Sequence, residues 1–169
     1  YQAVELPYYH KTSDSDTEAE LSMVILLSDE ESFTEVENRL TFEYLEKISE
    51  NLESKGVKLT MPQFAYESEL SSLRDILSEM GMPLVFSSEA DFSGMDGTYD
   101  LFIDEAIHKA FISVDEKGTQ AGAATIIVGP GSSPNDPIIM TLNHPFIFFI
   151  RDIETRAILF LGRVMNPTL

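Results

Sequence analysis

The chain has 169 residues, of which 43% are hydrophobic, and this is enough for one domain with a packed core. Eleven Lys and Arg stand against 29 Asp and Glu, a formal net charge of −18 that disfavours nucleic acids and anionic membranes, because both bind clustered cations. The sequence has no cysteine, which excludes disulfides, thiolate metal sites and cysteine nucleophiles.

The first third of the chain predicts two strands followed by two short helices. A strand-like run fills residues 1–8, a polar and acidic turn or loop follows at 10–20, and the apolar run 21–27 is typical of a strand buried on both faces. Ser32 to Glu35 has the spacing of a capping box, apolar residues recur at helical intervals from Val36 to Leu52, and Gly56 ends the stretch. A break at 38–41 predicts two helices. Because the sequence starts inside a strand-like run, without Met or a signal peptide, we expect a fragment or a processed chain.

The middle of the chain predicts a strand at 57–64, a helix over 70–80 that Gly81 ends, and a loop-rich stretch at 82–97. Residues 99–115 are the longest strand candidate. One face of that strand would carry small or apolar residues together with one histidine: Ala106, His108, Ala110, Ile112 and Val114. We expect His108 to be a buried, hydrogen-bonded residue and not a metal ligand or a catalytic base.

Residues 118–136 differ from the rest of the chain, since they are small and contain no Lys, Arg or aromatic residue. A flexible linker would explain their Gly, Ser and Pro content. It would not explain the uncharged alternation of Thr119, Ala121, Ala123, Thr125 and Ile127, which a strand needs if one face must be buried. The segment is therefore predicted to be a loop in one state and a strand in another.

Three apolar runs close the chain, at 138–142, 146–150 and 157–164, and the last two predict a hairpin. The fold class is therefore α+β, with three short helices among about eight strands. No HExxH, GxSxG or phosphate-binding glycine loop is present, so we expect neither an enzyme nor a metal or other cofactor.

Three stretches together resemble the serpin family of protease inhibitors: 114–125, 142–150 and 159–167. The first is similar to the family's hinge, the second to its C-terminal signature and the third to its usual ending. The resemblance covers essentially the whole chain. It implies the serpin fold, three β-sheets with surrounding helices, with residues 1–169 as the C-terminal part of a single serpin domain and an N-terminal part of the same serpin missing.

The resemblance also implies the role of particular residues. Residues 118–143 would be the reactive-centre loop and the strand after it, and the reactive bond would join Ser132 and Ser133, with Val128 as an alternative position. His108 would belong to the shutter, where the main sheet opens. The hinge would comprise Glu116, Gly118, Thr119, Ala121, Ala123 and Thr125, and the signature Asn143, Pro145 and Phe146.

Serpins act as suicide substrates: the protease cuts the loop, and the cut loop inserts into the main sheet. The small, uncharged hinge favours such an inhibitor over the alternative, a non-inhibitory serpin that serves as a binding or chaperone-like module. The absence of Lys and Arg from 118–143 indicates an elastase-like or subtilisin-like target and not a trypsin-like one. We expect a secreted, extracellular protein, with the cytoplasm as the open alternative.

Overall fold

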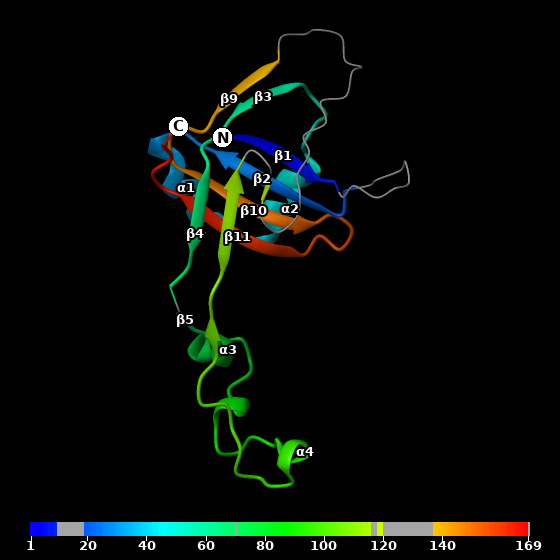
Figure 1. Cartoon of the computed structure of the whole chain (residues 1–169), viewed down its shortest axis with the longest axis vertical. Coiled ribbons are helices and arrows are strands. Elements are labelled where there is room, and N and C mark those ends of the chain that lie inside the picture. The colour runs from blue at the N-terminus through cyan, green and yellow to red at the C-terminus, as the bar shows by residue number, and fades with distance from the viewer. Residues whose placement is uncertain (10–18, 70, 116–117, 120–136, 169) are drawn as a thin grey trace. The chain divides into compact units, whose positions relative to one another are not determined.

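The computed structural model describes residues 1–9, 19–69, 71–115, 118–119 and 137–168. They form two compact units (Figure 1). Unit 1 comprises Tyr1–Phe64 and Ser113–Leu169, and unit 2 comprises Ala65–Ile112. Unit 2 is thus an insertion between the two chain segments that build unit 1.

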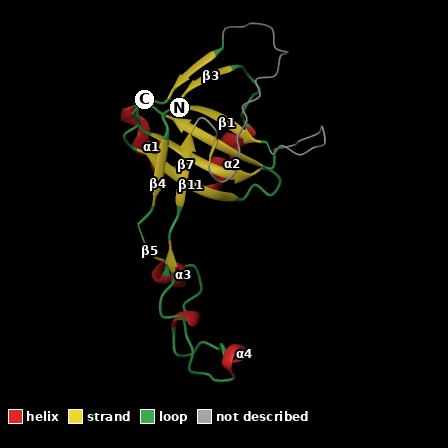
Figure 2. Ribbon diagram, viewed as in Figure 1, coloured by secondary structure: helices red, strands yellow, loops and turns green. Residues whose placement is uncertain are grey.

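The main element of unit 1 is a four-stranded antiparallel sheet in the order β1-β2-β10-β11 (Figure 2). Its strands are β1 (Gln2–Tyr8), β2 (Leu21–Leu27), β10 (Phe146–Asp152) and β11 (Ile158–Val164). β2 and β10 occupy the centre, where Met23 pairs with Ile150 and Leu27 with Phe146. The prediction of a strand at 21–27, buried on both faces, and of a closing hairpin is confirmed.

Two helices cover one face of this sheet, α1 (Phe33–Asn38) and α2 (Phe42–Glu50) (Figure 1). The buried side chains between helices and sheet come from all these elements: Val24, Leu26, Phe33, Val36, Leu45, Ile48, Ile147 and Phe149. The helical interval of the apolar residues reflects this contact, because residues three and four apart share one helix face. The predicted break between the helices lies at Arg39–Thr41.

The predicted capping box at Ser32 is wrong. A 3-10 turn, η1 (Glu30–Ser32), precedes α1, so Ser32 already has helical torsion angles, and its hydroxyl donates to the Asp29 carbonyl at 3.1 Å. A residue in that conformation does not cap the next turn. The cap that does form belongs to α2, where Thr41 Oγ1 accepts from the Tyr44 amide at 3.2 Å.

Shorter strands follow in chain order. β3 (Val57–Thr60) pairs in parallel with β9 (Ile138–Thr141), and β4 (Phe64–Glu67), β7 (Phe111–Asp115) and β8 (Gly118–Thr119) form a three-stranded sheet in the order β4-β7-β8. The single strand predicted at 57–64 is therefore two strands. Pro62 lies in the break between them, and it has no amide proton for a strand ladder.

Unit 2 holds short elements: β5 (Ser71–Ser72), α3 (Arg74–Glu79), η2 (Leu84–Phe86), α4 (Ser93–Asp96) and β6 (Ile107–His108). Gly81, with φ of 104°, lies just beyond α3, as predicted. The long strand predicted at 99–115 is only partly present. Residues 99–106 belong to no strand, and the Ile103 amide donates to the Val85 carbonyl at 2.9 Å instead.

Candidate functional site

The candidate site begins with β7, which leads out of unit 2 into the segment predicted as the hinge. Ile112 and Val114 are 8% and 7% exposed, whereas Phe111 and Asp115 are exposed. This alternation matches the face predicted from the sequence for the end of the strand. β7 therefore has one face of buried, apolar side chains, and a strand that pairs at its edge extends that face.

The first residues of the predicted hinge pair with this strand. β8 runs antiparallel to β7, with Gly118 opposite Asp115 and Thr119 opposite Val114. In the sheet order β4-β7-β8, β8 occupies the edge of β7 that β4 leaves free. Gly118 and Thr119, which the sequence predicts to be hinge residues, thus occupy the position of a further strand beside β7.

The other predicted loop residues lie outside the described residues. They are Glu116, Ala121, Ala123, Thr125, Val128, Ser132 and Ser133. Their roles stay predictions.

The burial expected of His108 is wrong for this chain. Its strand β6 pairs only with β5 among the described residues, with His108 opposite Ser71, and the histidine side chain is exposed. The pattern of small and apolar residues located a strand face but gave no information on what covers that face. The shutter role of His108 stays a prediction.

Between β6 and β7 the backbone leaves the strand conformation at Lys109 and Ala110. The Ala110 amide donates to Ser68 Oγ at 2.8 Å, and the Ser68 amide donates to the Ala110 carbonyl at 2.8 Å. Lys109 forms an ion pair with Glu67 next to this pair of bonds. A serine hydroxyl replaces a backbone carbonyl here, so the two chain segments stay joined across the break.

The predicted signature residues surround the start of β10. Phe146 is 0% exposed, Pro145 is half-buried and Asn143 is exposed. The Phe64 ring contacts the rings of Phe146 and Phe148, with centroids 5.9 and 5.4 Å apart. Sequence reasoning missed Phe64, which was assigned only to a strand, because aromatic contacts between distant segments leave no local pattern.

Gly162 explains why the Phe148 ring fits this place. The two residues are paired across β10 and β11, and a Cβ on Gly162 would lie 2.6 Å from the Phe148 ring. The glycine is therefore required by close approach and not by its backbone angles.

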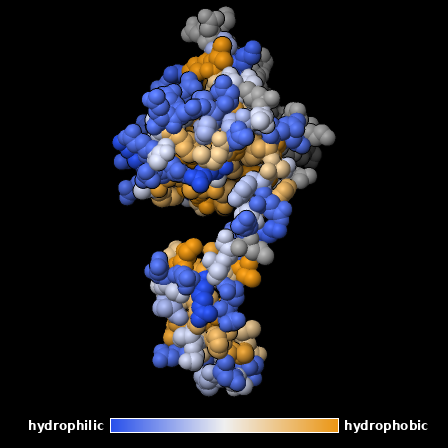
Figure 3. Space-filling view, turned by 90° about the vertical axis from the view of Figure 1, so that its left-hand side faces the viewer, coloured by the Kyte–Doolittle hydropathy of each residue, from blue (hydrophilic) through white to orange (hydrophobic). Residues whose placement is uncertain are grey.

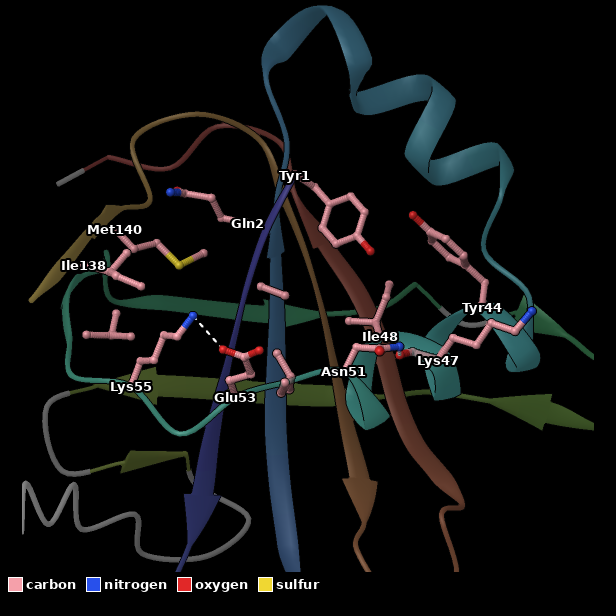
Figure 4. A pocket seen from close by; sticks show the side chains of 13 residues that line it. Tyr1, Gln2, Tyr44, Lys47, Ile48, Asn51, Glu53, Lys55, Ile138 and Met140 are labelled. Carbon is pink, nitrogen blue, oxygen red and sulfur yellow. Dashed lines mark hydrogen bonds and ion pairs between the residues drawn. The ribbon is translucent and has the colours of Figure 1, made fainter.

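A cavity of about 640 Å³ lies within unit 1 between α2, the start of β1 and the β3–β9 pair (Figure 4). Its apolar lining includes Ile48, Ile138 and Met140, and Tyr1 and Tyr44 stand edge to face beside it. Burial, with Tyr1 nearby, raises the pKa of Tyr44. Polar and charged side chains, among them Lys47, Asn51 and Glu53, complete the lining.

In the part of the chain that the structure describes, no group of three or more His, Asp and Glu could hold a metal ion. No helix among these residues is long and apolar enough to cross a membrane. The geometry that singles out a site is therefore the pairing of β8 with β7.

Comparison with known protein families agrees with the family resemblance seen in the sequence. The model of the family "Serpin (serine protease inhibitor)" matches residues 1–167. The chain belongs to the serpin family. It is 43% identical over 169 residues to a serpin-like protein of Thermococcus kodakarensis and 40% identical over 174 residues to leukocyte elastase inhibitor A of Rattus norvegicus, and each alignment covers 98% of the chain.

Solved structures show the same fold. Human thyroxine-binding globulin in complex with thyroxine matches with a TM-score of 0.69 and 27% identity, over 99% of this chain and 46% of that one. The two curated relatives are covered over only 37% and 44% of their own length. The chain thus carries part of the serpin fold, with the predicted mixture of helices and sheets, and spans less than half the length of these relatives.

Proposed function

We propose that this chain is the loop-bearing C-terminal part of an inhibitor of serine proteases that traps its target by loop insertion, and that it is not itself an enzyme. The observation that carries the proposal is the antiparallel pairing of Gly118 and Thr119 with Asp115 and Val114. Insertion requires a hinge that can enter a sheet beside an existing strand. β7 offers that strand, with an edge on which β8 already forms two residue pairs.

The register of this pairing supports a specific insertion path. If the register continued along β7, Ala121 would lie opposite Ile112. Directly opposite residues in antiparallel strands share a face, and Ile112 and Val114 belong to the buried one. The small, uncharged residues of the hinge would thus extend the buried face of β7. Insertion would add backbone hydrogen bonds and bury apolar surface, which supplies the free energy to hold the protease.

The proposal includes two partners, a target serine protease and an N-terminal part of the same serpin, since the relatives are more than twice as long as this chain. Residues 118–143 are proposed as the reactive-centre loop and the strand that follows it, with the reactive bond between Ser132 and Ser133. Small residues there and the absence of Lys and Arg favour an elastase-like or subtilisin-like target.

A serpin-length protein that contains this chain, either the natural protein or a chimera completed with the N-terminal part of the Thermococcus relative, tests this. It should form a complex stable in SDS with an elastase-like or subtilisin-like protease, and mass spectrometry should locate the cut at Ser132–Ser133. Fast, stoichiometric inhibition of trypsin would contradict the target class. Cleavage without any stable complex, with all proteases tried, would contradict the inhibitor.

A second candidate, a non-inhibitory serpin that acts as a binding module, is favoured by the cavity in unit 1. Thyroxine-binding globulin shows that a serpin can carry a small ligand. Titration of the same protein with an apolar fluorescent probe, with Met140→Trp to fill the cavity, separates the two functions. Probe binding by the parent protein that Met140→Trp abolishes would support the binding module, whereas a protease complex without any probe binding would leave the inhibitor as the function.

The extracellular space is the proposed place of action, with the cytoplasm as the alternative. Fractionation of the source cells, with detection by an antibody against this chain, distinguishes the two.

A further inference from the structure

Unit 2 carries an imbalance of charge that unit 1 does not share to the same degree. Residues 65–112 contain ten Asp and Glu but two cations, Arg74 and Lys109, a net charge of 2 − 10 = −8 in 48 residues. The rest of the chain, 121 residues, has −18 + 8 = −10. Unit 2 therefore carries about twice the negative charge per residue, and net charge of one sign destabilises a compact state by self-repulsion.

Both cations of unit 2 already have partners. Lys109 pairs with Glu67, and the Arg74 guanidinium lies 4.0 Å from an Asp104 carboxylate oxygen and donates to the carbonyls of Asp104 and Phe86. Eight of the ten carboxylates are thus left without a cation from their own unit. They are Glu69, Asp75, Glu79, Glu89, Asp91, Asp96, Asp100 and Glu105.

The apolar core that opposes this repulsion is small. Of 22 buried hydrophobic residues among the described part of the chain, only Phe86, Ala90 and Ile112 belong to unit 2. Large apolar side chains are instead exposed, such as Met80 at 76% and Met95 at 79%. Figure 3 shows hydrophobic residues between hydrophilic ones on the surface of the part labelled α3 and α4 in Figure 1.

We propose that the order of unit 2 depends on ionic strength, so that residues 65–112 are loosened in dilute buffer and tightened by salt while the sheet of unit 1 stays ordered. Counterions screen repulsion between exposed charges, and the screening length falls from about 30 Å at 0.01 M to about 3 Å at 1 M salt. Repulsion across a whole unit is thereby nearly abolished. Unit 1 gains less, because its charge is more dilute and its core is larger.

Hydrogen exchange on the 169-residue chain tests the proposal within one molecule. The reporters in unit 2 are the amides of Ser68, Leu73 and Ile103, which donate to backbone carbonyls at 2.8, 2.8 and 2.9 Å. Between 10 mM and 1 M NaCl their protection should rise about tenfold, since repulsion within the unit is screened. The amides of β2 and β10 should change by less than about twofold. An equal rise in both units, or none in unit 2, would overturn the proposal.

A variant with fewer carboxylates separates the screening of charge from the general salting-out of apolar surface, which does not depend on charge. Glu69→Gln, Glu79→Gln and Glu89→Gln together remove three exposed carboxylates that have no cation partner in the unit. This triple variant should be more protected than the parent chain in dilute buffer and should respond less to salt. The matched control, Glu31→Gln with Glu43→Gln and Glu154→Gln in unit 1, should leave the response of unit 2 unchanged. An unaltered salt response in the first variant would contradict screening.

The link to inhibition rests on the proposed function, whereas the exchange test does not. β7 starts in unit 2 at Phe111 and pairs with the hinge at Val114. Loop insertion in a serpin-length protein should therefore become sensitive to salt. If exchange in unit 2 responds to salt but no protease complex forms at any salt concentration, the proposed function is contradicted, whereas the salt dependence of unit 2 is supported.

Discussion

Unit 1 and unit 2 belong to one chain yet differ in how their strands are covered. In unit 1, β2 is buried from Ser22 to Leu27 and β10 from Phe146 to Ile150. Helices cover one face of these strands, and the Phe64 ring lies against Phe146 and Phe148 on the other. In unit 2, both residues of β5 and of β6 are exposed. The same types of residue are thus core in one unit and surface in the other, and the difference lies in the number of elements packed against each strand.

Unit 1 can bury a core with its own elements, and unit 2 cannot. A four-stranded sheet with helices on one face can bury a core within its own segments. A two-residue strand pair beside one turn of helix cannot. Unit 2 is held mainly by hydrogen bonds and by Arg74, and its free energy of local unfolding should therefore lie well below that of unit 1.

The largest expected effect compares one buried phenylalanine from each unit. Phe149→Ala removes a ring that is 1% exposed between β10 and the helices, and it should lower the free energy of unfolding of unit 1 by about 3–5 kcal/mol. Phe86→Ala should leave the unfolding of unit 1 unchanged and abolish exchange protection in unit 2 only. Denaturant titration with residue-resolved exchange measures both. If both variants lowered the stability of both units equally, the two units would not differ in stability as proposed.

Gly162→Ala tests the close packing of β11 against the Phe148 ring in unit 1. The new Cβ would lie 2.6 Å from the Phe148 ring, so the ring must shift, which should cost about 1–3 kcal/mol. Phe148→Leu in the same chain should restore part of the loss, because a smaller side chain leaves room for the methyl group. Thermal unfolding of the single and double variants checks this, and additive losses would contradict the contact.

Arg74→Lys tests what holds unit 2 together. Lysine keeps the charge, but its single nitrogen cannot reproduce the geometry in which two guanidinium nitrogens of Arg74 donate to the carbonyls of Asp104 and Phe86 at 2.9 and 3.1 Å. Local stability of unit 2 should fall by about 1–2 kcal/mol, seen as faster exchange of the Ile103 amide. The control is Arg39→Lys, whose exposed pair with Glu35 lies in unit 1 and should be nearly neutral.

The smallest effect is expected at the β10–β11 turn. Arg156 has a φ of 63°, which is strained for a residue other than glycine, and its guanidinium pairs with Glu46 at 2.7 Å and Glu50 at 3.0 Å. Arg156→Gly relieves the backbone strain but loses two exposed ion pairs, so the two effects on stability oppose each other. The melting temperature should change little at moderate salt. A large fall in the melting temperature would show that these ion pairs anchor the β10–β11 hairpin to α2.

Much of unit 1 was predictable from the sequence because its patterns are local. The apolar run 21–27 and the helical spacing from Val36 to Leu52 report burial that the same unit provides. The strand predicted at 99–115 and the burial of His108 failed in unit 2, since both depend on neighbours that a periodic pattern does not reveal. The cap at Ser32 failed because a preceding turn changed its backbone conformation.

Part of the candidate site was predictable as well. The alternation through Ile112 and Val114 and the uncharged residues from Thr119 onward indicated two strands that could meet. The register, Thr119 opposite Val114, could not be derived, because it depends on the geometry of the turn between them.

The proposed insertion beside β7 is tested most directly by a charge at the first inserted position. In a serpin-length protein containing this chain, Thr119→Arg would bring a guanidinium to the face that Val114 buries, and ~1.4 kcal/mol on the insertion barrier already slows it tenfold. The variant should be cut at the same bond yet release the protease, without the complex stable in SDS, whereas Gln120→Arg, on the opposite face, should retain most of it. Equal complex formation by the parent protein and Thr119→Arg would contradict loop insertion at β7.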